Sequence, residues 1–157
     1  MKISYKYLFL LGLTLSLLSS CKEEDPWVDA AAAPVLVDII GAPFGYPQAK
    51  DPTVEYPIAT AKLSLQARLL ELDKTNILNK DIGIDSIPVA GVKVIVSLRD
   101  GATLAEATSG ADGLLKIEKS WTELGVSAPK ANQLIKLSWT GSYKGVTFTR
   151  FSQIKAL

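Results

Sequence analysis

The chain has few residues of the types that perform acid–base, nucleophilic or metal chemistry. Its 157 residues contain no histidine and one cysteine, Cys21. Without histidine there is no Ser-His-Asp triad, no Cys-His pair, no histidine general base and no histidine-ligated zinc. One cysteine is too few for an intrachain disulfide framework or a cysteine-rich metal site. The residue types therefore predict no catalytic residues, no metal ligands and no cofactor.

Carboxylates are the remaining candidates for chemistry, and their spacing favours loop and turn roles. The stretch 79–85 has one Asn and two Asp around a glycine, but its spacing is not that of a calcium-binding EF-hand loop. Asp100 and Asp112 each precede a glycine, as turn residues do. A carboxylate-only glycosidase needs two facing acids about 5–9.5 Å apart in a cleft. That enzyme stays an alternative, and the prediction is a non-enzyme.

The residues before Cys21 have the organisation of a secretory signal. Lys2 and Lys6 form a short positive region, and an apolar run from Leu8 to Leu18 follows. As a helix, the run would span roughly 16 Å, about half the hydrocarbon core of a bilayer. We therefore predict that residues 1–20 are a signal peptide rather than a membrane span or a buried helix.

The segment that ends at the cysteine is more specific. It consists of Leu18, Ser19, Ser20 and Cys21, directly after the apolar run. These residues resemble the lipobox of bacterial lipoproteins. In that family the peptide is cut before the cysteine, the thiol is alkylated with diacylglycerol, and the new amine is usually acylated. The resemblance implies that outer-membrane lipid is a partner of the chain through acylated Cys21.

The charged residues after the cysteine carry a second resemblance. They are Lys22, Glu23, Glu24 and Asp25. The stretch is similar to the Lys-acidic-acidic export signal of surface lipoproteins in Bacteroidota. It implies an outer-membrane protein that is lipid-anchored and displayed on the cell surface. The alternative is a solvated charge run in a tether, which any lipoprotein can carry.

The rest of the chain has the composition of one globular domain. Residues 21–33 are predicted to be a lipidated flexible tether, and residues 34–157 a single β-sandwich domain. Hydrophobic residues make up 48% and charged residues 21%, as in globular proteins. The formal net charge of +1 provides no basic field, so we expect no nucleic-acid partner.

Alternating apolar and polar residues, separated by turn dipeptides, predict strands. Val92–Leu98 is the clearest strand, and Asp100-Gly101 follows it as a hairpin turn. Lys62–Asp73 also alternates, although its helix-forming residues make a helix the rival interpretation. The prediction is an all-β fold, a single antiparallel Ig-like or transthyretin-like β-sandwich of about seven strands. The predicted strands are Val35–Ile40, Lys62–Asp73, Val92–Leu98, Leu104–Thr108, Leu114–Lys119, Leu134–Thr140 and Val146–Ile154.

Three details of these strands are also predicted. The alternation of the second strand slips near Leu69-Leu70, which indicates a β-bulge there. Gly141-Ser142 is expected to form the turn into the last strand. In that strand Val146 and Phe148 are expected to face the core.

Two phrases in the middle of the chain resemble the carboxypeptidase regulatory-like domains. Residues 88–94 read Pro-Val-Ala-Gly-Val-Lys-Val. In residues 107–117, Thr108 is followed by the turn Asp112-Gly113 and then by Ile117, with one residue more between Thr108 and Asp112 than the family's phrase has. These phrases cover about a quarter of the domain. The resemblance implies a transthyretin-like β-sandwich and an accessory, non-enzymatic module, and it carries over no site residues.

The segment Ala42–Thr60 is the candidate binding region. Its four prolines exclude a helix and a central strand. Loops of this length are uncommon, and aromatic residues argue against plain disorder. The segment is expected either to cover one end of the sandwich or to bind a partner. Candidate binding residues are Phe44, Tyr46, Tyr56 and Trp121. Trp121 directly follows a predicted strand, and its candidacy depends on the expectation that its side chain is exposed there.

Together these features predict a surface lipoprotein that acts through binding or assembly. The partner would be a protein or a glycan of unknown identity. The alternative function is a glycan-binding accessory protein of a surface uptake system. That alternative requires exposed aromatic side chains, because sugar rings stack on them.

Overall fold

The computed structural model describes residues 33–43 and 51–157. By its contacts the chain divides into two units, Met1–Ala32 and Ala33–Leu157. The described residues form strands and turns without any helix, so none of their segments is a helix able to cross a membrane. The fold is all-β, as predicted.

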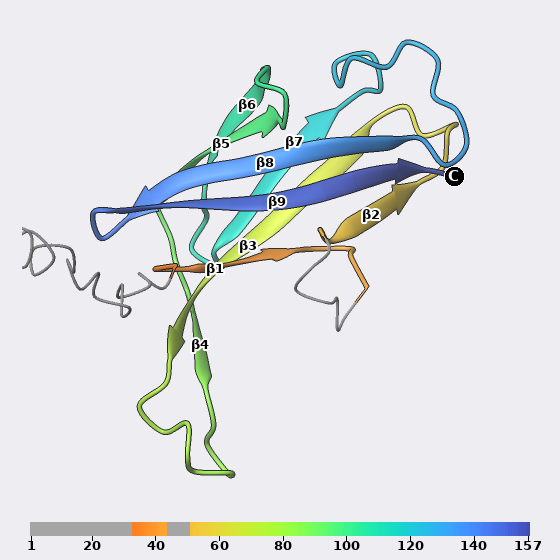
Figure 1. The fold of residues 1–157 in the computed structure, drawn as a ribbon. Helices are drawn as coiled ribbons and strands as arrows, with labels where there is room; N and C mark the ends of the chain where they lie inside the picture. The colour runs from red at the N-terminus through yellow and green to blue at the C-terminus, as the bar shows by residue number, and fades with distance from the viewer. Residues whose placement is uncertain (1–32, 44–50) are drawn as a thin grey trace, which may run out of the picture. The chain divides into compact units, whose positions relative to one another are not determined.

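Nine strands form two sheets that pack as a sandwich (Figure 1). In one sheet β3 is central, and β1 pairs along one of its edges. Along the other edge, β7 pairs with the first half of β3 and β4 pairs with its last four residues. The other sheet has the order β2-β9-β8-β5-β6. Every pair is antiparallel except β2 and β9. The strands are β1 Leu36–Ile39, β2 Thr53–Tyr56, β3 Leu63–Asp73, β4 Asp85–Pro88, β5 Lys93–Leu98, β6 Thr103–Thr108, β7 Leu114–Lys119, β8 Leu134–Tyr143 and β9 Val146–Ala156.

The predicted inward faces form the core between the sheets. Alternate residues of β3, from Leu63 to Leu69, are buried, which confirms a strand there and excludes the helix. Val94 and Val96 on β5 are fully buried. Trp139 on β8 is buried as well, and its indole N–H donates to the Ser152 hydroxyl over 2.9 Å. A buried indole N–H needs such a partner, which explains a serine inside the core.

The predicted bulge at Leu69-Leu70 is wrong. The pairing of β3 with β1 and β4 runs through these residues without a shift in register. A register shift lies instead between Val96 and Ser97, where β5 meets β6. Leu70 is the last residue of β3 that pairs with β1, and beyond it the strand projects from the sandwich with β4 alone (Figure 1). No second sheet packs over this ribbon, so strict alternation is not enforced there.

The turn between the last two strands also differs from the prediction. β8 continues through Gly141-Ser142 to Tyr143, and the turn is formed by Lys144 and Gly145. Both turn residues have positive φ, 50° and 78°, as a tight two-residue hairpin turn requires. Val146 is consequently 41% exposed, whereas Phe148 is buried as predicted.

Two strands were not predicted from the sequence. β2 lies inside the proline-rich segment, and it pairs with β9 only, at the edge of its sheet. This position agrees with the exclusion of a central strand, but residues 42–60 are not one continuous loop. β4 pairs only with the end of β3, and all four of its residues are exposed. The sandwich therefore has nine strands rather than about seven.

Gly113 lies where β7 gives way to β4 along the edge of β3. Its carbonyl accepts the N–H of Leu69 over 2.9 Å, and Val89 donates to the Leu69 carbonyl over 3.0 Å. Gly113 has φ +73°, and an added Cβ would lie 2.5 Å from the Leu69 oxygen. Only glycine fits this position, because it combines a left-handed backbone with close approach of another strand.

Candidate functional site

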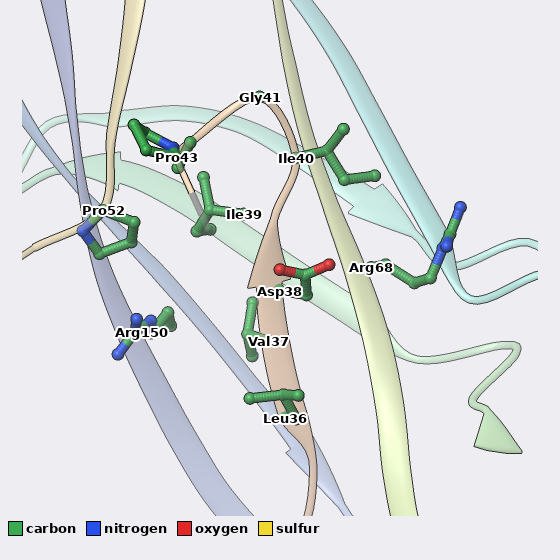
Figure 2. A pocket seen from close by; sticks show the side chains of 11 residues that line it. Leu36, Val37, Asp38, Ile39, Ile40, Gly41, Pro43, Pro52, Arg68 and Arg150 are labelled. Carbon is green, nitrogen blue, oxygen red and sulfur yellow. The ribbon is translucent and has the colours of Figure 1, made fainter. Parts of the chain in front are cut away.

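A cavity of about 570 Å³ opens beside β1 (Figure 2). Residues from β1, β3 and β9 line it, together with the described residues next to the segment 44–50. It therefore lies where the edge of one sheet faces the other sheet. Concave surfaces with a few polar groups are the usual locations of binding sites.

β1 forms the central wall of the cavity. Val37 and Ile39 point into the core, with 5% and 6% exposure, and they hold the strand in place. Leu36 is 45% exposed. Within the described residues β1 pairs only with β3, so one backbone edge of β1 has no strand partner. Such an edge can pair with an extended segment of another chain.

Two prolines lie at the rim of the cavity. Pro43 follows the turn at Gly41, whose φ of +91° redirects the chain after β1. Pro52 precedes β2, and its carbonyl accepts the Gln153 N–H over 2.8 Å. These residues stand on either side of the segment 44–50, which lies outside the described part of the chain.

A partly buried ion pair fixes the position of Pro52. Arg99 Nη2 donates to Asp51 Oδ2 over 2.5 Å, and Gln153 Nε2 donates to the same oxygen over 3.3 Å. The Arg99 guanidinium also lies 4.2 Å from the centroid of the Phe151 ring, a cation–π contact. Because Asp51 directly precedes Pro52, these contacts hold one side of the cavity rim.

Arg150 is the polar group that distinguishes the cavity. It lies on β9 opposite Trp139, so its backbone position belongs to the core-facing side of the sheet. Figure 2 shows its side chain beside Pro52, across from β1. Its Nε is buried and has no hydrogen-bond partner among the described residues. A buried donor without a partner costs free energy, so an incoming acceptor would be favoured here.

The charges around the cavity favour an oxygen-bearing ligand group. Arg150 contributes a guanidinium group on the core-facing side of the cavity. Arg68 and Asp38 stand opposite each other in the β1–β3 register on the outer face, and Figure 2 shows the Arg68 side chain directed away from Arg150. A guanidinium matches a carboxylate or carbonyl oxygen, to which it donates parallel hydrogen bonds. Among the described residues no group of three or more Asp, Glu, His or Cys is placed to hold a metal ion.

The structure describes only some of the predicted site residues. Cys21, the stretch 22–25, Phe44 and Tyr46 lie outside the described residues. Tyr56 is half-buried at the end of β2, and its hydroxyl donates to the Ser64 carbonyl over 2.5 Å. Burial raises the pKa of the Tyr56 phenol. Its ring packs against the core and does not line the cavity.

The expectation that Trp121 is exposed is wrong. Trp121 is 7% exposed, and its indole N–H donates to the Ile58 carbonyl over 3.1 Å. The turn after β7 directs it inward, because Glu123 accepts the Ser120 N–H over 2.8 Å and the Ser120 hydroxyl over 2.9 Å. Trp121 therefore stabilises the sandwich and offers no platform for a sugar ring.

The same turn gives a prediction for acid stability. The hydrogen bonds from the backbone and side chain of Ser120, and then that from Lys119, lower the pKa of Glu123 to about 2 from 4.5. A lowered pKa stabilises the fold above pH 4.5, and this contribution is lost as the pH falls towards 2. Glu123→Gln should therefore melt below the wild type at pH 7, and the two melting temperatures should converge near pH 2. A constant difference at all pH values would contradict this.

Arg150 is the site residue that sequence reasoning did not identify. The core-facing register that buries Phe148, Ser152 and Ile154 also contains Arg150. A charged residue in such a register is a signal that the sequence offered. The pairing of β1 with β3 places the open edge of β1 near Arg150. No local sequence pattern predicts this pairing.

Comparison with known proteins gives no family assignment. No family model matches the chain, and no curated protein matches it. One similar solved structure is an endo-β-1,4-mannanase from Thermotoga petrophila, with 13% identity, a TM-score of 0.41, and coverage of 83% of this chain and 21% of that one. Another is an engineered protein, with 19% identity, a TM-score of 0.37, and coverage of 81% and 21%. The chain thus spans about a fifth of the length of each, and the functional argument rests on its own residues.

Proposed function

We propose that the chain is a lipoprotein of the outer membrane, displayed on the cell surface, whose sandwich is a non-catalytic binding or assembly module. The lipobox-like residues that end at Cys21 support the anchor, and the charged residues 22–25 support export. The observation that carries the binding role is the cavity beside β1, with the unpartnered Nε of Arg150 on its wall.

The partner that fits this cavity best is a segment of another protein. The open edge of β1 offers backbone groups to an extended chain, and Arg150 offers donors to a carboxylate or carbonyl oxygen. A glycan is less well supported. Trp121 is buried, and the hydroxyl of Tyr56 is already bonded to Ser64.

A non-catalytic role is supported by the available side chains. The whole chain lacks histidine, and its one cysteine is the proposed lipidation site. Among the described residues that line the cavity, Asp38 is the one with a carboxylate, and a glycosidase would need two facing carboxylates. Binding is the function that these groups can perform.

Photocrosslinking on intact cells tests the binding role. A photoreactive amino acid at Leu36, which lines the cavity and is 45% exposed, should give a discrete protein adduct. The same amino acid at Ile95, 42% exposed on β5, is the matched control and should give none. Arg150→Gln should weaken the Leu36 adduct by about tenfold or more, because a hydrogen bond to a charged group contributes about 1.5–3 kcal/mol.

Two controls complete this experiment. Arg150→Gln should keep the melting temperature of the wild type, because the exchanged Nε bonds to no described residue. The same adducts from Leu36 and Ile95, or an adduct insensitive to Arg150→Gln, would contradict binding at this cavity.

A further inference from the structure

The connection from β3 to β4 projects from the sandwich as a hairpin (Figure 1). Beyond Leu70, β3 pairs along this edge with β4 alone, and the two strands project from the rest of the sandwich (Figure 1). All residues of β4 are exposed. We call the segment 74–84 between the two strands the hairpin tip. A free two-stranded ribbon has little stability of its own in water, so its surroundings matter.

The hairpin tip is unusually apolar for an exposed segment. Leu78 is 98% exposed, and four isoleucines of the hairpin are between 44% and 59% exposed: Ile77, Ile82, Ile84 and Ile87. Single exposed aliphatic residues are common on protein surfaces, but a group of five on one projection indicates an interaction surface.

Turns within the hairpin tip bond part of its backbone. Asn76 accepts the N–H of Asn79, and Asn79 accepts those of Ile82 and Gly83, over 2.7 to 3.1 Å. The Asn79 side chain accepts the Asp81 N–H over 3.0 Å. Each of these bonds lowers the cost of moving the tip towards an apolar phase, because unbonded polar backbone resists such transfer. The remaining backbone groups fit a shallow position at the level of the headgroups, where water is still present.

The entry of the chain into the domain lies at the base of this hairpin. β1 is antiparallel to β3, and its first residue, Leu36, stands opposite Leu70. The start of β1 therefore points towards the same end of the domain as the hairpin. Fourteen residues, Lys22 to Val35, separate Cys21 from β1, and they can span at most about 50 Å. The hairpin reaches no more than about 30 Å beyond Leu70, even if fully extended.

We propose that the hairpin tip inserts into the surface of the membrane that holds the acylated Cys21, as a second, non-covalent contact. This inference rests on the proposed lipid anchor. The tether is long enough to let the tip reach the bilayer from a domain that is anchored at the same end. Leu78 and its isoleucine neighbours enter the boundary between headgroups and acyl chains.

The charges of the hairpin agree with this orientation. The tip carries Lys74 and Lys80 against Asp81, and lysine stems can lie along apolar surface while their ammonium groups stay in water. Asp73 and Asp85 stand opposite each other where the β3–β4 ribbon meets the hairpin tip. The base is also tied to the sandwich, since Glu71 accepts hydrogen bonds from Tyr143 and Lys144.

A fluorescent probe tests the contact in the lipidated full chain. Leu78→Cys, labelled with an environment-sensitive dye, is reconstituted into vesicles of phosphatidylethanolamine and phosphatidylglycerol. Because Cys21 is acylated, position 78 carries the one free thiol. A lipid-borne quencher should remove most of its emission. A dye at Ser127→Cys, exposed in the loop before β8, should keep its emission.

Serine substitutions measure the aliphatic contribution. In the Leu78→Cys protein, Ile77→Ser should lower the lipid-bound population relative to the free one by about tenfold, as expected for one buried aliphatic side chain. The matched control is Leu134→Ser, because Leu134 is 51% exposed like Ile77 but starts β8 on the sandwich. It should leave the quenching unchanged.

The outcomes separate the two proposals. Wild-type protein that does not float with vesicles would overturn the lipid anchor and this inference with it. Protein that floats, while the dye at 78 stays open to aqueous iodide, would overturn this inference alone. If the dye is shielded from iodide only at high protein density, and the lipid-borne quencher has no effect, the tip contacts a second copy of the chain. That result would also overturn this inference.

Discussion

Replacing Val94 by Asp should abolish cooperative folding of the domain. Val94 is fully buried on β5, between Ala107 and Gly141 of the neighbouring strands. A carboxylate there has no partner, and an unpaired buried charge costs about 3–5 kcal/mol or more. Domains of this size are stable by only about 5–15 kcal/mol, so most of the stability is lost. Urea denaturation followed by circular dichroism measures the effect.

The matched control for this prediction is the next residue on the same strand. Ile95 points to the other face of β5 and is 42% exposed. Ile95→Asp should change the free energy of unfolding by no more than about 1 kcal/mol, as surface substitutions usually do. Equal losses at both positions would show that the two faces of β5 are not core and surface.

Replacing Gly113 by Ala should lower the free energy of unfolding by about 3 kcal/mol or more. A left-handed backbone costs a residue with a Cβ about 1–2 kcal/mol. The new Cβ would also lie 2.5 Å from the Leu69 oxygen, on the backbone of a central strand that cannot move freely. Urea midpoints of the wild type and the variant measure the loss.

Gly91 offers a control that separates these two causes. Its φ is +74°, nearly that of Gly113, but an added Cβ would meet nothing within 4 Å. Gly91→Ala should therefore cost only the conformational term, about 1–2 kcal/mol. If both variants lose the same stability, the close approach of Gly113 to Leu69 does not limit the fold.

The sequence was informative where one strand carries its own pattern. Ile135 and Leu137 on β8 have Lys136 between them, and Val94 and Val96 on β5 follow Lys93 and precede Ser97 with the same spacing of two. The structure buries all four. Their alternation requires only one covered face, which a sandwich supplies. This local rule explains why the all-β class and all seven predicted strands are confirmed.

The rule fails where a strand depends on one neighbour. β2 has four residues beside prolines, and β4 has four exposed residues, so neither has a buried face to recognise. Each exists because a longer strand, β9 or β3, provides hydrogen-bond partners. The prediction for Trp121 failed for a related reason. Its burial depends on a turn and on a hydrogen bond to the carbonyl of Ile58, which is distant in the sequence.

The candidate site was predictable only in part. The segment 42–60 was recognised by its prolines and aromatics, and Pro43 and Pro52 do line the cavity. Arg150 and the open edge of β1 come together only through the packing of the two sheets. The polar residues around Gly83 predict a loop, but no local pattern shows that the aliphatic residues of the hairpin tip stay exposed.

The central claim is a lipid-anchored sandwich, and metabolic labelling of Cys21 tests it most directly. Cells that express the wild type or Cys21→Ser are fed an acyl-chain analogue, and label incorporation into the purified protein is measured. The proposal predicts a labelled wild type and an unlabelled variant, because Cys21 is the one cysteine in the chain. Equal labelling of both proteins, or label in neither while a known lipoprotein in the same cells is labelled, would contradict it.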